Sequence, residues 1–228
     1  MNKIKVIQEC ENPEVLVVTP LLPNHTISKK TKTTLKRNKT PLFWITSTGK
    51  GNIPVNAQYG INWYKKKYGT LPEFYIMIDN DIDMGRGMID KLVHRLRPQE
   101  DFVAFAYASF KFVGVVNAEF PAVAYDVDKL MEHNYISSQS LIRTKCLEKI
   151  GGLVTDSKYV RLLDWALWLK FFYNDLIGIN CPTASFVATA SEGSVSSGSD
   201  QDYNYKRSLV MKDFVTPIIE KYIELNKK

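Results

Sequence analysis

The sequence is poor in cysteine and lacks any long hydrophobic run. Its three cysteines, Cys10, Cys146 and Cys181, lie far apart and form no CxxC motif or Cys/His cluster. This spacing argues against a zinc site or a disulfide framework and favours a reducing compartment. No window approaches the roughly 20 apolar residues of a membrane-spanning helix. Residues 1–11 also lack the continuous apolar segment of a signal peptide, so we expect a cytoplasmic protein.

The chain has the composition of an ordinary folded protein. It is 228 residues long, with 45% hydrophobic and 24% charged residues. This suits one α/β domain over residues 1–228, alone or as a piece of a longer protein, and argues against extensive disorder. The formal net charge is +6, and much of the excess lies in residues 29–39. The lysines there are not interleaved with aromatic residues, so we interpret them as a solvated helix face and expect no nucleic-acid partner.

Hydrophobic runs and helical patterns alternate through the first half of the chain. Short apolar runs at residues 14–19 (EVLVVT), 41–46 (PLFWIT), 74–78 (FYIMI) and 102–107 predict buried strands. Helices are predicted between them at residues 28–37, with Ser28 as the N-cap, at 54–67 and at 85–96. This alternation predicts an α/β fold with a mostly parallel central sheet and helices on both faces. Ligands of such sheets bind at the carboxyl ends of the strands.

The second half of the chain is less regular. Short strands are predicted at residues 110–116 and 122–125, and helices at residues 144–150, 162–172 and 205–225. Residues 191–202 are rich in Ser, Gly and Asp, a composition typical of a loop. The sequence shows no internal repeat and no sign of a second domain.

An acidic cluster, Asp79-Asn80-Asp81-Ile82-Asp83, directly follows the strand predicted at residues 74–78. Three carboxylates at alternate positions repel one another unless a cation or hydrogen-bond donors compensate. Mg²⁺ and Mn²⁺ prefer oxygen ligands, and Mg²⁺ is often held by one or two carboxylates together with substrate phosphates. The cluster therefore predicts a metal–diphosphate site. The alternative is a tight turn or a helix cap, where Asp and Asn are also common.

The first predicted strand ends at Thr19-Pro20. The end of such a strand is a place where a nucleotide base can lie against backbone groups. The alternative is a strand that is stopped by proline and binds no ligand.

Several blocks of sequence carry a family resemblance through their order and spacing. They are VLVVTP, GNIPVNAQYGINWYKKKYG, FYIMIDNDID, YISSQSLIRTKCLEKIGGL and LLDWALWLKF, within residues 15–172. Together they resemble the GT-A glycosyltransferases, most of all the inverting family 2. The resemblance implies a single GT-A domain with a metal-dependent hexosyl- or deoxyhexosyltransferase activity. The sugar would pass from a nucleoside-diphosphate sugar, with UDP favoured, to a hydroxyl of a glycan or other acceptor.

The resemblance also implies roles for individual residues. The residues expected to bind the nucleotide-sugar donor are Thr19, Pro20, Gln58, Asp79, Asn80 and Asp81. Asp81 and Asp83 are the expected ligands of Mn²⁺ or Mg²⁺. Asp164 lies where the family keeps its catalytic base, which takes the proton from the acceptor hydroxyl in an inverting displacement. Without the family, Asp164 is equally well explained as a helix N-cap. Trp165 and Trp168 are interpreted as sugar platforms or as core residues.

The chain also departs from the family pattern. Residues 46–50, after the second predicted strand, lack the acidic residue that commonly binds the base, and Leu163 takes the place of the usual Glu before the catalytic Asp. Two other functions stay open. One is a sugar nucleotidyltransferase, although residues 21–30 lack the Gly-rich loop usual there. The other is a degenerate domain that binds glycan or nucleotide. A membrane-bound acceptor would be reached by peripheral contact.

Overall fold

The computed structural model describes residues 2–115, 117–190 and 200–227. Nine strands in these residues form one sheet in the order β1-β3-β2-β4-β8-β6-β9-β5, with β7 paired to β6. The strands are β1 (Lys3–Gln8), β2 (Val15–Leu21), β3 (Leu42–Thr48), β4 (Phe74–Met77), β5 (Asp83–Met84), β6 (Val103–Gly114), β7 (Ala118–Phe120), β8 (Leu141–Arg143) and β9 (Ile177–Ala190).

Helices connect and cover these strands. They are α1 (Lys29–Leu35), α2 (Ile53–Tyr68), α3 (Met88–Leu96), α4 (Val127–Glu132), α5 (Thr144–Lys149), the 3₁₀-helix η1 (Ser157–Tyr159), α6 (Leu163–Tyr173), α7 (Asp200–Val210), the π-helix η3 (Met211–Val215) and α8 (Thr216–Leu225). Among these described helices, none is both long and apolar enough to cross a membrane.

The first half of the chain follows the prediction. β2 pairs in parallel with both β3 and β4, and α1 and α2 form the connections. Ser28 caps α1 as predicted, because its Oγ accepts a hydrogen bond from the Thr31 N–H at 3.0 Å. Asn52 caps α2 in the same way, by accepting from the Val55 N–H at 2.9 Å.

The sheet as a whole is mixed, so the prediction of a mostly parallel sheet is not confirmed. Among the described residues three strand pairings are parallel and five are antiparallel. One reason is the short strand β8, which lies between β4 and β6 and is antiparallel to both. The outer strands β1, β5 and β7 are also antiparallel to their neighbours. Strands β2, β3, β4, β6 and β9 still point the same way, so their carboxyl ends share one edge.

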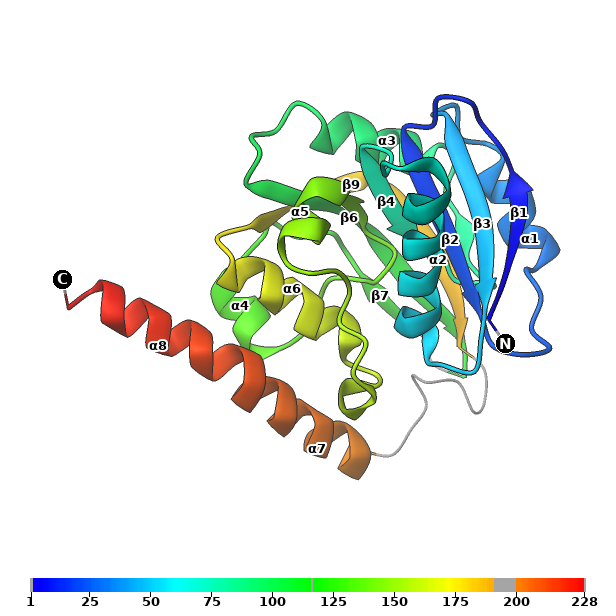
Figure 1. Ribbon diagram of the computed structural model, residues 1–228. Coiled ribbons are helices and arrows are strands. Elements are labelled where there is room, and N and C mark those ends of the chain that lie inside the picture. The colour runs from blue at the N-terminus through cyan, green and yellow to red at the C-terminus, as the bar shows by residue number, and fades with distance from the viewer. Residues whose placement is uncertain (1, 116, 191–199, 228) are drawn as a thin grey trace.

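Helices cover both faces of the sheet, as predicted (Figure 1). One face packs against α2, α5 and α6, and the other against α1 and α3. Each strand of the first half supplies both layers by alternation: Leu16 and Val18 face α2, whereas Val15 and Val17 face the opposite layer. Gly60 lets α2 approach the sheet, because an added Cβ would lie 2.8 Å from Val18 Cγ1.

Other expectations need correction. The strands predicted at residues 102–107 and 110–116 are one strand, β6, and residues 122–125 form no strand. The predicted stop at Pro20 is also wrong, because β2 continues to Leu21. β4 ends opposite Val18, so Pro20 has only β3 beside it and its missing N–H leaves no gap in the β2–β4 ladder. Of the loop predicted at residues 191–202, residues 191–199 lie outside the described part.

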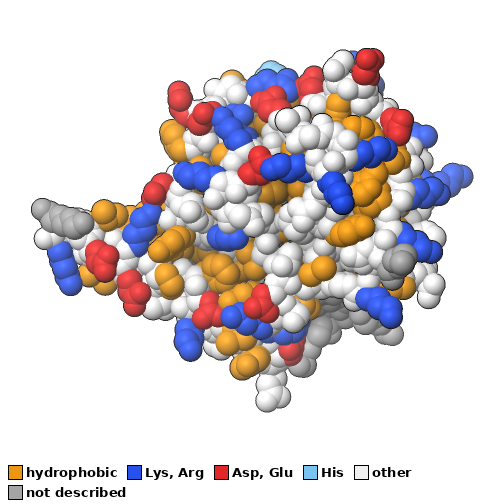
Figure 2. Space-filling view, viewed as in Figure 1, with side chains coloured by type: hydrophobic (Ala, Val, Ile, Leu, Met, Phe, Trp, Pro, Cys, Tyr) orange, Lys and Arg blue, Asp and Glu red, His pale blue; other side chains and the backbone are white. Residues whose placement is uncertain are grey.

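The C-terminal helical segment packs on α6 and then extends away from the body of the molecule (Figure 1). Val210, Val215 and Ile218 are buried against the core, whereas the end of α8 exposes Ile223 and Leu225. Figure 2 shows apolar side chains along this projection, and on the same face Lys and Arg are interspersed with Asp and Glu.

Candidate active site

A cavity of about 870 Å³ lies at the carboxyl end of β4. Three segments that are distant in sequence supply its polar residues: residues 79–81 after β4, residues 134–139 before β8, and residues 161–164 at the start of α6. Aliphatic side chains form one wall and include Met77, Ile142, Leu163 and Leu167. The wall on the other sheet face is aromatic and consists of Phe110, Phe112, Phe120 and Phe186.

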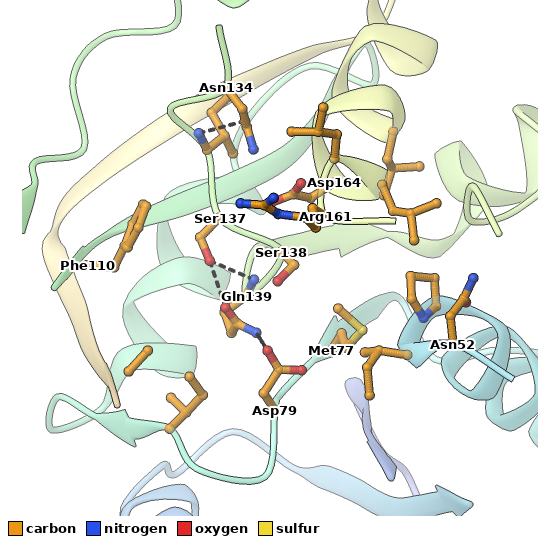
Figure 3. A pocket seen from close by; sticks show the side chains of 18 of the residues that line it. Asn52, Met77, Asp79, Phe110, Asn134, Ser137, Ser138, Gln139, Arg161 and Asp164 are labelled. Carbon is orange, nitrogen blue, oxygen red and sulfur yellow. Dashed lines mark hydrogen bonds between the residues drawn. The ribbon is translucent and has the colours of Figure 1, made fainter. Parts of the chain in front are cut away.

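Asp79 occupies the polar end of β4. Its Oδ2 accepts a hydrogen bond of 2.7 Å from the Gln139 amide, and the Ser137 hydroxyl donates to Gln139 Oε1 at 2.7 Å, so a buried chain of side chains orients this carboxylate (Figure 3). Burial, together with the nearby charges of Asp81 and Asp164, raises the pKa of Asp79 to about 6, although the Gln139 hydrogen bond acts in the opposite direction.

The two acidic residues that follow, Asp81 and Asp83, lie in different environments. Asp81 lines the cavity beside Asp79, and burial raises its pKa. Asn80 also lines the cavity, but its amide donates to the Thr26 carbonyl at 3.1 Å, so its side chain shapes the loop. Asp83 is not among the described lining residues; its carboxylate pairs with Lys30 at 3.0 Å, and its backbone belongs to β5.

Asp164 faces the same cavity from the first turn of α6. Its Oδ1 accepts from the Trp165 N–H at 2.8 Å. Burial raises the pKa of this carboxyl to about 6, while hydrogen bonds from the Trp165 backbone and from the Asn134 side chain work against that rise. The carboxylate is therefore largely ionised at neutral pH and more basic than an exposed aspartate, as suits a general base.

Arg161 brings positive charge to the end of the cavity that holds Asp164 (Figure 3). Among the described lining residues it is the only lysine or arginine. Its backbone is left-handed, with φ 83°, a conformation that costs energy in a non-glycine residue and is common at functional sites. Its guanidinium lies 3.5 Å from Asp202 and packs over the Tyr203 ring, both in α7.

The carboxylates near β4 fit a divalent cation in part. Asp79 is half-buried and Asp81 is exposed, the pKa values of both carboxyls are raised, and a cation between them would relieve this cost. Two carboxylates suffice when substrate phosphates complete the shell, as is usual for Mg²⁺. In the described part of the chain no group of three or more His, Cys, Asp or Glu side chains is placed to hold a metal. Asp79 and Asp81 therefore fit such a site better than the predicted pair Asp81 and Asp83.

Comparison with known proteins supports the fold. No family model matches the sequence, and neither does any curated protein sequence. Structures of TarS from S. aureus do match. TarS itself superposes with a TM-score of 0.52 at 11% identity, over 86% of this chain and 39% of that chain. TarS 1–349 in complex with UDP gives 0.55 at 12% identity, over 86% and 64%. The complex with UDP-GlcNAc gives 0.53 at 12% identity, over 89% and 71%.

These values establish a shared fold and no more, because the identity is low. This chain spans about two fifths of the first TarS structure and about two thirds of the shorter ones.

The remaining predicted donor residues lie outside this cavity, and their role stays a prediction. Thr19 and Pro20 are buried within β2, where Thr19 Oγ1 accepts from the Trp44 indole at 3.0 Å. Gln58 supports the cavity from behind, since its Oε1 accepts from the Leu153 N–H at 2.8 Å. Trp165 and Trp168 are fully buried core residues, which excludes them as sugar platforms in this conformation.

The lining residues that the sequence analysis did not name include Gln139, Arg161 and Tyr75. Gln139 lies 60 positions from its partner Asp79, so no local pattern connects them. Arg161 precedes the predicted base by three residues, but its left-handed backbone leaves no mark in the sequence. Tyr75 does carry a signal, because the alternation of a strand places it on the same face as Met77 and Asp79.

Proposed function

We propose that this protein is a glycosyltransferase that moves a sugar from a nucleoside-diphosphate sugar, with UDP favoured, to a hydroxyl of a glycan acceptor. The observation that carries the proposal is that Asp79 and Asp81 line the same cavity as Asp164, although more than 80 positions separate them. The fold adds support, because TarS shares it and has been crystallised with UDP and with UDP-GlcNAc.

In this proposal the two ends of the cavity divide the work. Asp79 and Asp81 would hold Mn²⁺ or Mg²⁺ with the donor diphosphate, and Gln139 would keep Asp79 oriented. The ion, when bound, would supply Lewis-acid stabilisation of the leaving diphosphate.

Asp164 is the proposed base. Its ionised carboxylate would accept the proton of the acceptor hydroxyl while that oxygen attacks the anomeric carbon and the bond to the diphosphate breaks. A single displacement of this kind inverts the anomeric configuration. The acceptor would lie against the aromatic wall around Phe110 and Phe120, because the apolar faces of pyranose rings pack well on aromatic rings.

Ligand-induced thermal stabilisation tests the donor site. The wild type and Asp81→Ala would be melted with UDP, GDP, TDP or CMP, each with and without Mn²⁺. UDP with Mn²⁺ should stabilise the wild type by about 2.7 kcal/mol at a hundredfold excess over Kd, and the variant should lose this effect. Asp128→Ala, an exposed change in the first turn of α4, is the matched control.

A second variant separates the two candidate ligand pairs. Asp83→Ala should keep the metal-dependent effect of UDP, since Asp83 faces Lys30. If it loses the effect, the original pair Asp81 and Asp83 is correct. If no nucleoside diphosphate stabilises the wild type with or without metal, the transferase proposal fails and a degenerate binding domain becomes the better account.

A further inference from the structure

Charge is distributed unevenly along the chain. Between Glu14 and Glu73 the sequence contains ten residues that are Lys or Arg and no Asp or Glu, whereas acidic residues outnumber basic ones in the rest of the chain. Many of these cations lie in α1 and directly after it, at the end of the molecule opposite the C-terminal projection (Figure 1). Figure 2 shows Lys and Arg side chains along the outer edge at this end. Such a concentration of one sign of charge attracts partners of the opposite sign.

The outward side of α1 carries a basic face, which consists of Lys29, Lys32, Lys36 and the following Arg37, all exposed. The three lysines recur at intervals of three and four residues, so they lie on one side of the helix. In the described part of the chain none of these four side chains forms an ion pair, whereas Lys30 pairs with Asp83. The charges of the basic face are therefore open to a partner.

Hydrogen bonds fix the opposite side of α1 to the loop that borders the cavity. Thr31 is fully buried, and its hydroxyl donates to the carbonyl oxygens of Asn80 and Ile82, at 2.9 Å each. The Ser28 N–H donates to the Asn80 carbonyl at 2.8 Å. Because Asn80 and Asp81 line the cavity, a partner on the basic face is held close to the end of the cavity that follows β4.

The basic face suits a flat anionic surface better than an anionic polymer. None of its four residues lines the cavity of the candidate site, so it provides no groove that would enclose a polymer chain. Residues 26–41 contain no aromatic side chain on which nucleic-acid bases stack. A membrane surface requires neither feature, because each Lys or Arg near anionic lipids strengthens binding about fivefold by charge alone.

We propose that the basic face of α1 binds the surface of a membrane that contains anionic phospholipids. The lysine and arginine side chains contact the lipid phosphates, and the buried side of α1 keeps the cavity next to that surface. The contact is peripheral and electrostatic. This inference goes beyond the proposed function and does not depend on it, because it concerns attachment to a surface and not sugar transfer.

Vesicle cosedimentation tests the proposal on the full chain. The wild type should bind vesicles of phosphatidylcholine and phosphatidylglycerol in equal parts, but not vesicles of phosphatidylcholine alone. The combined variant Lys29→Gln, Lys32→Gln and Lys36→Gln should bind the anionic vesicles on the order of a hundredfold more weakly, since three contributions of about fivefold are lost. Raising the salt from about 0.1 M to about 1 M shortens the Debye length from about 10 Å to about 3 Å and should release the wild type.

The matched control replaces three exposed lysines that already pair with carboxylates. Lys65→Gln, Lys111→Gln and Lys145→Gln together change the net charge by the same amount, but each of these lysines forms an ion pair with a Glu or an Asp. Vesicle binding of this control should stay close to that of the wild type. Both combined variants should keep the wild-type melting temperature, because exposed charges of this kind contribute little to stability.

The proposal is wrong if the wild type does not bind the anionic vesicles. Equal loss of binding in the two combined variants would also overturn it, because net charge rather than the basic face would then govern binding. Inorganic polyphosphate serves as the competing probe. If the basic face binds polyphosphate but not the vesicles, its partner is a soluble polyanion and the membrane is excluded.

Discussion

Asp79 and Asp164 reach the same cavity with pKa values of about 6, but the two carboxylates are held differently. Asp79 has a second carboxylate beside it and depends on a side chain, Gln139, for its orientation. Asp164 is oriented in part by the backbone N–H of Trp165 in its own helix, and burial is the largest cause of the raised pKa in both carboxyls. A carboxylate with a second one directly beside it in sequence suits a cation, whereas one held by hydrogen bonds in a partly apolar setting suits proton transfer. In the proposed function, position within one cavity would thus separate two roles for the same residue type.

The strongest test of this difference is Asp164→Asn. The amide keeps the shape of the side chain but cannot accept a proton, so kcat should fall about 10²–10⁴-fold. Metal-dependent UDP binding should remain, because Asp79 and Asp81 are untouched. The measurement is a transfer assay together with UDP titration. Nearly full activity in this variant would assign the base elsewhere.

The same variant should change how stability depends on pH. Folding raises the pKa of Asp164 from an ordinary value of 3.8 to about 6, so the folded protein binds more protons than the unfolded chain between these values. The stabilisation is fully present below about pH 4 and is lost as the pH rises through 6. Relative to wild type, Asp164→Asn should therefore gain on the order of 2 kcal/mol in unfolding free energy from pH 4 to 7.5.

Urea denaturation of both proteins across this pH range, without metal, measures the effect. A constant difference between the two proteins would show that the Asp164 carboxyl titrates normally. The rate of transfer should follow the opposite trend in the wild type, rising through about pH 6, because only the ionised carboxylate can act as a base.

The smallest expected effect comes from removing the hydrogen bond by which Gln139 orients Asp79. Gln139→Met removes the amide donor while nearly preserving volume, and it should weaken metal-dependent UDP binding about tenfold, in line with the loss of one hydrogen bond to a charged group. At saturating donor kcat should change little, since Asp164 does not depend on Gln139. Donor titrations that report kcat and KM separately distinguish this result from a general loss of folding, in which both would worsen.

Local sequence patterns predicted much of the first half of the chain. β2, β3 and β4 were found because each carries a short apolar run, and α1 was found with its N-cap, Ser28. β1 and β9 were not found, and β6 was divided in two. β9 carries a Pro and several polar residues (IGINCPTASFVATA), and its place in the sheet comes from pairing with β6 rather than from a pattern of its own.

The residues of the candidate site were likewise predicted only in part from the sequence. The acidic cluster and Asp164 were recognised from motif blocks that lie along the chain. The sequence by itself determined which residue types were available at the end of β4 and at the start of α6. Only the tertiary structure decided that Asp81 lines the cavity while Asp83 turns to Lys30, that Gln139 supports Asp79, and that the Tyr75 hydroxyl meets no hydrogen-bond partner among the described residues. The contacts of Asp83 with Lys30 and of Gln139 with Asp79 join residues some 50 to 60 positions apart. The environment of the Tyr75 hydroxyl likewise depends on which distant segments reach it. Periodicity reports the face on which a residue lies, but it cannot report which distant group meets it there.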